Sequence, residues 1–193
     1  MQPINILLVD DQLSSLLVLE DLLASLKVNL LKATSAKDAL LIMLNNDISC
    51  ILLDVSMPEM DGFEFLKTLQ AAPAHANIPV IMVTGKIFSE NETLRAYQYG
   101  AVDFLIKPLD SQVVYRKVSF FVHQAQRIKC IENIEHILKG ISTEILKPLK
   151  KVITKDHITD NHLLSELAQA VVKIEELQQN WCTFQHDKHN TAL

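Results

Sequence analysis

The first half of the chain alternates between short apolar runs and longer segments with apolar residues at helical spacing. The apolar runs are INILLV, VNLLKA, CILLDV, IPVIMVT and VDFLIK. After the first run, leucines recur at helical spacing, at positions Leu16, Leu19, Leu22, Leu23 and Leu26. Asn91–Tyr99 is predicted as a further helix that stops at Gly100. Strands that alternate with such helices predict an α/β fold with a parallel sheet, and the continuous apolar runs predict strands buried on both faces.

Chemically active side chains stand where these predicted strands end. They are Asp10 and Asp11 after the first run, Asp54 in the third, Thr84 in the fourth and Lys107 in the fifth. Because the carboxyl ends of parallel strands meet at one edge of a sheet, we expect these side chains to lie together. Carboxylates that converge in this way repel one another unless a cation neutralises them, and oxygen ligands in an open crevice suit Mg²⁺ better than zinc. A neighbouring lysine and hydroxyl would complete a site for a transferred phosphoryl group.

Residues 1–122 resemble the receiver domain of bacterial two-component response regulators. The matching motifs are LLVDDQ, LLDVSMPEMDGFEFL, IPVIMVTG and GAVDFLIKPLD, which together cover the whole predicted fold. The resemblance implies a flavodoxin-like, doubly wound parallel sheet of five strands in the order 2-1-3-4-5. It also implies that a partner histidine kinase or phosphotransfer protein phosphorylates an aspartate of this chain.

The resemblance implies roles for individual residues. Asp54 is the phosphoacceptor, and Thr84 and Lys107 bind oxygens of the phosphoryl group after transfer. Thr84 is coupled to the aromatic side chain of Phe104, which turns inward when the hydroxyl moves towards the phosphate. Pro108 follows the lysine through a cis peptide bond. Together these residues would convert a local change of charge into a change of packing.

A metal site and two tuning positions follow from the same resemblance. Mg²⁺ would be held by Asp10, Asp11 and Asp54 together with the backbone carbonyl of Ser56. Ser56 and Lys86 resemble the variable positions beside the phosphate that tune its hydrolysis. The expected cofactor is therefore Mg²⁺ alone.

Residues 123–193 are predicted to form a separate helical unit that follows the receiver's last helix without a break. Apolar residues at spacings of three and four predict the long helix: Val114, Val118, Phe121, Ala125, Ile128, Ile131, Ile134, Leu138, Ile141 and Ile145. After the polar segment HITDN, a second amphipathic helix is predicted with Asp160 as its N-cap. Because a two-helix hairpin alone cannot bury both apolar stripes, we expect a homodimer that forms a four-helix bundle.

Three interpretations of this tail remain open from the sequence. The favoured one starts from ISTEILKPL, which resembles the phosphoacceptor helix of histidine-kinase dimerisation domains, except that Thr143 replaces the histidine. The tail would then be a degenerate hairpin that assembles and binds other proteins. In the second, HILKG resembles the active motif of phosphotransfer domains, and His136 makes the chain a phosphorelay intermediate. The third is an unrelated dimerising coiled coil.

Composition and charge narrow the possible outputs. Residues 1–110 hold 7 Lys/Arg and 14 Asp/Glu, a net charge of −7, whereas the remainder carries +2. This distribution, with no convincing helix-turn-helix, argues against DNA binding. No apolar run approaches the roughly 20 residues that cross a bilayer, and the N-terminus lacks the features of a signal peptide. The 3 widely spaced cysteines fit a reducing cytoplasm. We therefore expect a cytoplasmic response regulator with a downstream protein target.

Overall fold

The computed structural model describes residues 3–140, together with residues 165, 169 and 172. The chain divides into two compact units, Met1–Lys129 and Cys130–Leu193. In the first unit, a parallel sheet has the order β2-β1-β3-β4-β5. Its strands are β1 (Asn5–Val9), β2 (Asn29–Ala33), β3 (Ile48–Asp54), β4 (Val80–Thr84) and β5 (Ala101–Ile106). The predicted fold class and strand order are therefore confirmed.

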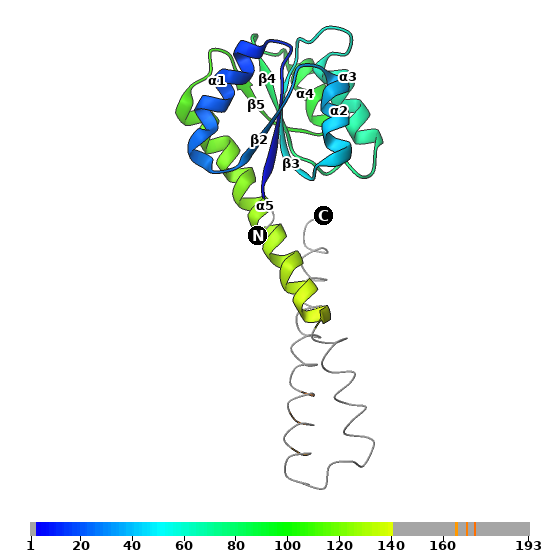
Figure 1. Cartoon of the computed structure of the whole chain (residues 1–193). Helices are drawn as coiled ribbons and strands as arrows, with labels where there is room; N and C mark the ends of the chain where they lie inside the picture. The colour runs from blue at the N-terminus through cyan, green and yellow to red at the C-terminus, as the bar shows by residue number, and fades with distance from the viewer. Residues whose placement is uncertain (1–2, 141–164, 166–168, 170–171, 173–193) are drawn as a thin grey trace. The chain divides into compact units, whose positions relative to one another are not determined.

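Helices cover both faces of this sheet, as Figure 1 shows. One face carries α1 and α5, and the opposite face carries α2, α3 and α4. The helical elements are α1 (Leu13–Leu23), the 3₁₀ turn η1 (Ala24–Leu26), α2 (Ala36–Asn45), α3 (Gly62–Ala71), α4 (Glu90–Gln98) and α5 (Ser111–Gly140). The single long helix predicted to continue from the receiver is thus observed as far as residue 140. The predicted second helix of the hairpin and its Asp160 cap lie outside the described residues.

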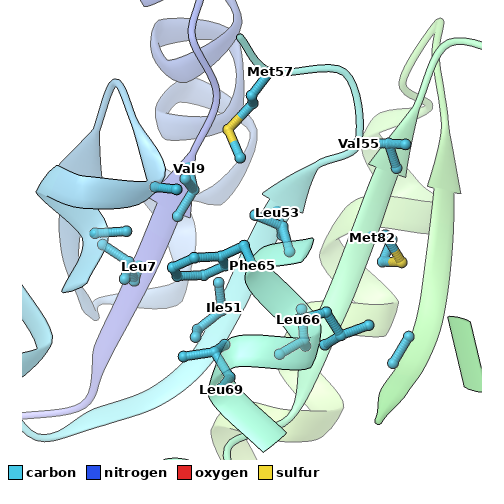
Figure 2. Packing of buried hydrophobic residues seen from close by; sticks show 14 of the residues in the cluster. Leu7, Val9, Ile51, Leu53, Val55, Met57, Phe65, Leu66, Leu69 and Met82 are labelled. Carbon is cyan, nitrogen blue, oxygen red and sulfur yellow. The ribbon is translucent and has the colours of Figure 1, made fainter. Parts of the chain in front are cut away.

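The core consists of two apolar layers, one on each face of the sheet. Successive residues of a strand point to opposite faces, so Leu7 packs on the side of α2 and α3, whereas Ile6 and Leu8 pack on the side of α1 and α5. Figure 2 shows the first layer, in which the ring of Phe65 from α3 lies beside the sheet residue Ile51. Phe65 is completely buried. These layers fix the strand ends, and hence the loops that follow them.

The two outer strands are less buried than the sequence predicts. The central strands β1 and β4 are buried at every position, whereas β2 and β5 each contain exposed residues. Val102 and Ile106 of β5 are exposed despite their apolar side chains. The prediction that every strand is buried on both faces is therefore wrong for β2 and β5. The physical reason is their place at the edges of the sheet, where the covering helices leave part of each strand open.

Capping boxes fix the beginnings of α3 and α4. In α3, Asp61 accepts a hydrogen bond from the backbone N–H of Glu64, and the Glu64 side chain accepts one from the N–H of Asp61. In α4, Ser89 and Glu92 make the same reciprocal pair. The predicted helix Asn91–Tyr99 is observed one residue earlier at each end, because Ser89 caps its start and Tyr99 is its C-cap. Both caps lie next to loops at the carboxyl edge of the sheet.

Candidate functional site

Three of the predicted site residues meet at the carboxyl edge of the sheet. Asp10 follows β1, Asp54 ends β3 and Lys107 follows β5. The Lys107 ammonium donates to Oδ1 of Asp54 at 2.7 Å and to Oδ2 of Asp10 at 2.8 Å. The two carboxylate side chains are only 1% and 7% exposed, for Asp10 and Asp54 respectively. One cation therefore bridges two buried acids that come from different strands.

The two carboxylates of this cluster stabilise the charged form of Lys107. Burial alone would lower the pKa of Lys107, but its hydrogen bonds to Asp10 and Asp54, and their negative charges, outweigh burial and raise it. Because the pKa is raised in the folded state, the stability that this lysine contributes is present in full below its ordinary pKa. That stability is lost only as the pH rises through the raised value. Lys107 therefore keeps its positive charge at neutral pH.

Backbone groups orient both carboxylates. The second oxygen of Asp54 accepts from the N–H of Ser56 at 2.7 Å, and Oδ1 of Asp10 accepts from the N–H of Gln12 at 2.9 Å. Gly62 closes the loop after Asp54, because its N–H donates to the carbonyl of Val55 at 3.0 Å. A Cβ atom on Gly62 would lie 2.6 Å from the Asp54 carbonyl oxygen, so only glycine permits this approach. The loop thus fixes the acid that the sequence singles out.

Thr84 lies at the end of β4, and the backbone of Lys86 engages its hydroxyl. Oγ1 of Thr84 donates to the Lys86 carbonyl at 3.0 Å and accepts from the Lys86 N–H at 3.2 Å. The Thr84 carbonyl accepts from the N–H of Lys107 at 2.7 Å, which ties this strand end to the residue that carries the bridging ammonium. The Lys107–Pro108 peptide bond is cis, as the resemblance implied. Thr84 itself is buried.

The comparison with known proteins agrees with this geometry. Residues 6–119 match the family model of the response regulator receiver domain. The chain belongs to this family. The receiver fold is shared with the Vibrio cholerae chemotaxis protein CheY4, with a TM-score of 0.58 and 24% identity, covering 62% of this chain and 99% of that one. A putative response regulator from Chloroflexus aurantiacus has a TM-score of 0.58 and 25% identity, covering 63% of this chain and 99% of that one.

Curated relatives of this receiver are longer proteins. The cyclic di-GMP phosphodiesterase response regulator RpfG of Xanthomonas campestris is 30% identical over 174 residues, which is 87% of this chain and 43% of that protein. The transcriptional regulatory protein ZraR of Salmonella typhimurium is 42% identical over 109 residues, which is 55% of this chain and 24% of that protein. The chain thus spans less than half the length of these curated relatives. These matches identify a response regulator receiver, consistent with two-component signalling.

The predicted switch residue Phe104 belongs to an aromatic cluster beside the receiver site. Its ring makes edge-to-face contacts with Phe88 and with Tyr97, each at a centroid distance of 5.2 Å. Phe88 also contacts Phe63, at 5.6 Å. Phe104 has no hydroxyl to hold it by a hydrogen bond, and aromatic packing holds it instead. The sequence analysis did not identify Phe88 and Tyr97. Phe88 lies before the predicted helix Asn91–Tyr99 and Tyr97 lies within it, and their only signal was their aromatic character.

The structure brings together fewer acids than the predicted metal site requires. Asp10 and Asp54 share the Lys107 ammonium, whereas Asp11 is partly exposed. Among the residues that the structure describes, no group of three His, Cys, Asp or Glu side chains is close enough to hold a metal ion. The oxygen donors of Asp10 and Asp54 still match the chemistry that Mg²⁺ prefers. Receiver domains typically use Mg²⁺ for phosphorylation.

The tail residues singled out from the sequence have separate outcomes. His136 lies exposed on α5, and Thr143 lies outside the described residues. The family match covers the receiver and gives the phosphotransfer interpretation of His136 no support. No helix within the described part of the chain is long and apolar enough to cross a membrane.

Proposed function

We propose that Asp54 accepts a phosphoryl group from a phosphohistidine on a partner kinase or phosphotransfer protein. The observation that carries the proposal is the Lys107 ammonium, which lies 2.7 Å from Asp54 and 2.8 Å from Asp10. An oxygen of Asp54 would attack phosphorus, the P–N bond to the histidine would break, and the imidazole would leave and take up a proton. Lys107 would then neutralise a phosphoryl oxygen in place of the Asp54 charge.

The proposal includes Mg²⁺ as the cofactor. Asp10, Asp11, Asp54 and the backbone carbonyl of Ser56 would hold it, and all four donate oxygen. The ion would neutralise negative charge on the phosphoryl oxygens as the group is transferred. Asp10 is kept ready as a ligand by the N–H of Gln12, which holds one of its two oxygens. Asp54 likewise receives the N–H of Ser56 on one oxygen and Lys107 on the other.

The response within the receiver would begin at Thr84. Its hydroxyl would leave the backbone of Lys86 and bind a phosphoryl oxygen. That movement would open space for Phe104, whose ring now packs against Phe88 and Tyr97. The charge added at Asp54 would thus bias the packing of α4 and β5, since a ligand shifts an equilibrium by its differential affinity for the two states.

For the output, we propose a receiver at residues 1–122 and a helical unit at residues 123–193 that dimerises. The apolar stripe of this unit would pair with that of a second copy, and the dimer would bind a downstream protein rather than DNA. The charge of −7 on residues 1–110 supports a protein target. We place the chain in the cytoplasm, because Cys50 and Cys130 are free thiols, as is usual in a reducing compartment.

A second candidate output follows from the length of one alignment. The match to the Xanthomonas phosphodiesterase covers 87% of this chain and thus extends beyond the receiver at residues 6–119. This favours a role of the tail in coupling the receiver to cyclic di-GMP turnover. The check is a hydrolysis assay with cyclic di-GMP, using the chain with and without phosphodonor. Phosphorylation-dependent hydrolysis would support this candidate, and absence of hydrolysis would reject it for this chain.

The chemical linkage of the phosphate tests the main proposal. The wild-type protein, Asp54→Asn, Asp47→Asn and His136→Ala would each be incubated with a small phosphodonor and Mg²⁺. We expect a base-labile acyl phosphate that is absent only in Asp54→Asn. Asp47 is an exposed acid paired with Lys129, which makes it a matched control. Phosphate that persists in Asp54→Asn, or an acid-labile phosphate lost in His136→Ala, would contradict the proposal.

A further inference from the structure

A chain of hydrogen bonds leads from the Thr84 hydroxyl to the first turn of α4. The hydroxyl uses both its donor and its acceptor on Lys86, at 3.0 Å and 3.2 Å. The side chain of the same lysine donates to Oε1 of Glu92 at 2.7 Å. Thr84 is therefore held by the backbone of a residue whose side chain is itself anchored.

Glu92 is held firmly at its end of this chain. Its second oxygen, Oε2, accepts from the backbone N–H of Ser89 at 2.9 Å and from the Ser89 hydroxyl at 3.0 Å. Ser89 in turn caps α4, since its hydroxyl accepts from the N–H of Glu92 at 3.3 Å. The carboxylate thus binds the loop with one oxygen and the helix cap with the other. These contacts lower the pKa of Glu92 to about 2, with the Lys86 hydrogen bond as the largest cause, followed by the Ser89 backbone.

We propose that Glu92 is a positioning residue that, through Lys86, holds the Thr84 hydroxyl in its unphosphorylated position. The inference rests on the proposed role of Thr84 in binding a phosphoryl group at Asp54. To donate to that group, the hydroxyl must give up its hydrogen bond to the Lys86 carbonyl, because it has a single proton to donate. Anchoring Lys86 to α4 stabilises the loop conformation in which that bond exists. Glu92 therefore opposes phosphoryl binding. When Thr84 moves towards the phosphoryl group, the contact between Lys86 and Glu92 would break, and the start of α4 would move as a result.

A different role for Lys86 makes an opposite prediction, which allows a clear test. If the ammonium of Lys86 instead bound the phosphoryl group, its removal would weaken binding. If the pair with Glu92 restrains Thr84, removal of either partner strengthens binding. The geometry points to restraint, because the ammonium contacts Glu92 at 2.7 Å and the lysine's carbonyl takes the only proton that the Thr84 hydroxyl can donate.

The experiment uses Glu92→Gln, Lys86→Gln and the double variant in the full chain. Glutamine at position 92 keeps an acceptor for Ser89, so the helix cap is retained while the charge that binds Lys86 is removed. Affinity for beryllofluoride with Mg²⁺, a mimic of the phosphoryl group, would be measured by titration. We expect each single variant to bind about two- to fivefold more tightly, as suits an exposed ion pair. The double variant should gain no more than either single one.

Controls separate this inference from general electrostatics. Glu20→Gln breaks another exposed ion pair, with Lys32 at 2.8 Å, and should leave the affinity unchanged. The gain in Glu92→Gln should shrink at about 1 M salt, where charges are screened within about 3 Å. Independently of any phosphate mimic, the amide proton of Lys86 should exchange faster in Glu92→Gln, because Lys86 is then no longer anchored to α4 and its hydrogen bond to Thr84 opens more often.

The outcomes are distinguishable from those of the proposed function. Failure of the wild-type protein to bind beryllofluoride would overturn the role of Asp54 and, with it, this inference. If the wild type binds and Asp54→Asn does not, the proposed site stands. Unchanged affinity in Glu92→Gln, or weaker binding in Lys86→Gln, would then overturn the restraint alone.

Discussion

Two lysines lie near the same edge of the sheet and differ in what surrounds their partners. Lys107 bridges Asp10 and Asp54, two buried carboxylates at the ends of β1 and β3. Lys86, whose side chain is 63% exposed, pairs with Glu92 on the first turn of a helix. Breaking a buried charge pair leaves an uncompensated charge, whereas an exposed pair is worth little. The first cluster therefore builds the site, and the second is weak enough to be rearranged when the site changes.

Gly62 supports the buried cluster and gives the largest expected effect on stability. A Cβ atom there would meet two backbone atoms, at 2.6 Å from the carbonyl oxygen of Asp54 and 2.9 Å from Cα of Val55. Backbone cannot yield as a flexible side chain does, so Gly62→Ala should lower the free energy of unfolding by about 2–3 kcal/mol. Gly85→Ala is the matched control, because an added Cβ would have no neighbour within 4 Å. Urea unfolding measures both, and equal stabilities would contradict this view of the loop.

Removal of the bridging cation tests the buried cluster directly. Lys107→Met would leave Asp10 and Asp54 buried without their shared partner, at an expected cost of about 1–3 kcal/mol at neutral pH, since Lys107 is itself partly exposed. Because the pKa of Lys107 is raised, the deficit should be present in full below the lysine's ordinary pKa of 10.5 and should shrink only as the pH rises through the raised value.

The control for Lys107 is a lysine of similar exposure with an exposed partner. Lys32 pairs with Glu20, whose side chain is 40% exposed, so Lys32→Met should cost less than about 1 kcal/mol. Chemical unfolding across a range of pH compares the two variants. Equal losses would show that burial of the acids does not set the strength of the Lys107 contacts.

The contacts of the aromatic cluster should contribute less to stability than the buried Lys107 contacts and more than the exposed Lys86–Glu92 pair. Phe88→Leu removes one edge-to-face contact with Phe104 and the contact with Phe63, and should cost about 1 kcal/mol while it frees Phe104. Phe120→Leu is a control, because Phe120 is exposed on α5 and contacts only the neighbouring Phe121 among the aromatic pairs of the described chain. Ring-proton NMR spectra of Phe104 should change in the first variant only. An unchanged spectrum in Phe88→Leu would contradict the packing role of that ring.

The contrast between the two lysines also explains what could be predicted from the sequence. Asp10, Asp54 and Lys107 could be placed together, because the ends of parallel strands coincide whatever the details of the loops. The pairing of Lys86 with Glu92 depends on the path of the loop between them, which no periodicity records. A Ser-x-x-Glu signal was visible at Ser89 and would have corrected the start of α4.

Two further differences have the same physical origin. Hydrophobic runs identify strands but do not record how much of each strand the helices cover. The exposure of β2 and β5 was therefore missed, although the implied strand order places both at the edges of the sheet. Both consecutive aspartates were expected at the site, and of the two it is Asp10 that contacts Lys107. The pattern of the sequence thus predicts which strand ends meet, because topology determines that. It does not predict which individual side chains make contact there.

The smallest expected effect is a titration shift in the exposed pair. The pKa of Glu92 is lowered to about 2, chiefly by its hydrogen bond with Lys86. Because the folded pKa is depressed, the contribution of this contact is present above the ordinary value of 4.5 and is lost as the pH falls towards about 2. In Lys86→Gln the pKa should rise part of the way towards 4.5, since Ser89 still donates two hydrogen bonds. Carbon-13 NMR titration of the carboxyl group measures the pKa of Glu92. The control variant Lys32→Gln should leave that pKa unchanged. A Glu92 pKa that stays near 2 in Lys86→Gln would assign the depression to the helix cap instead.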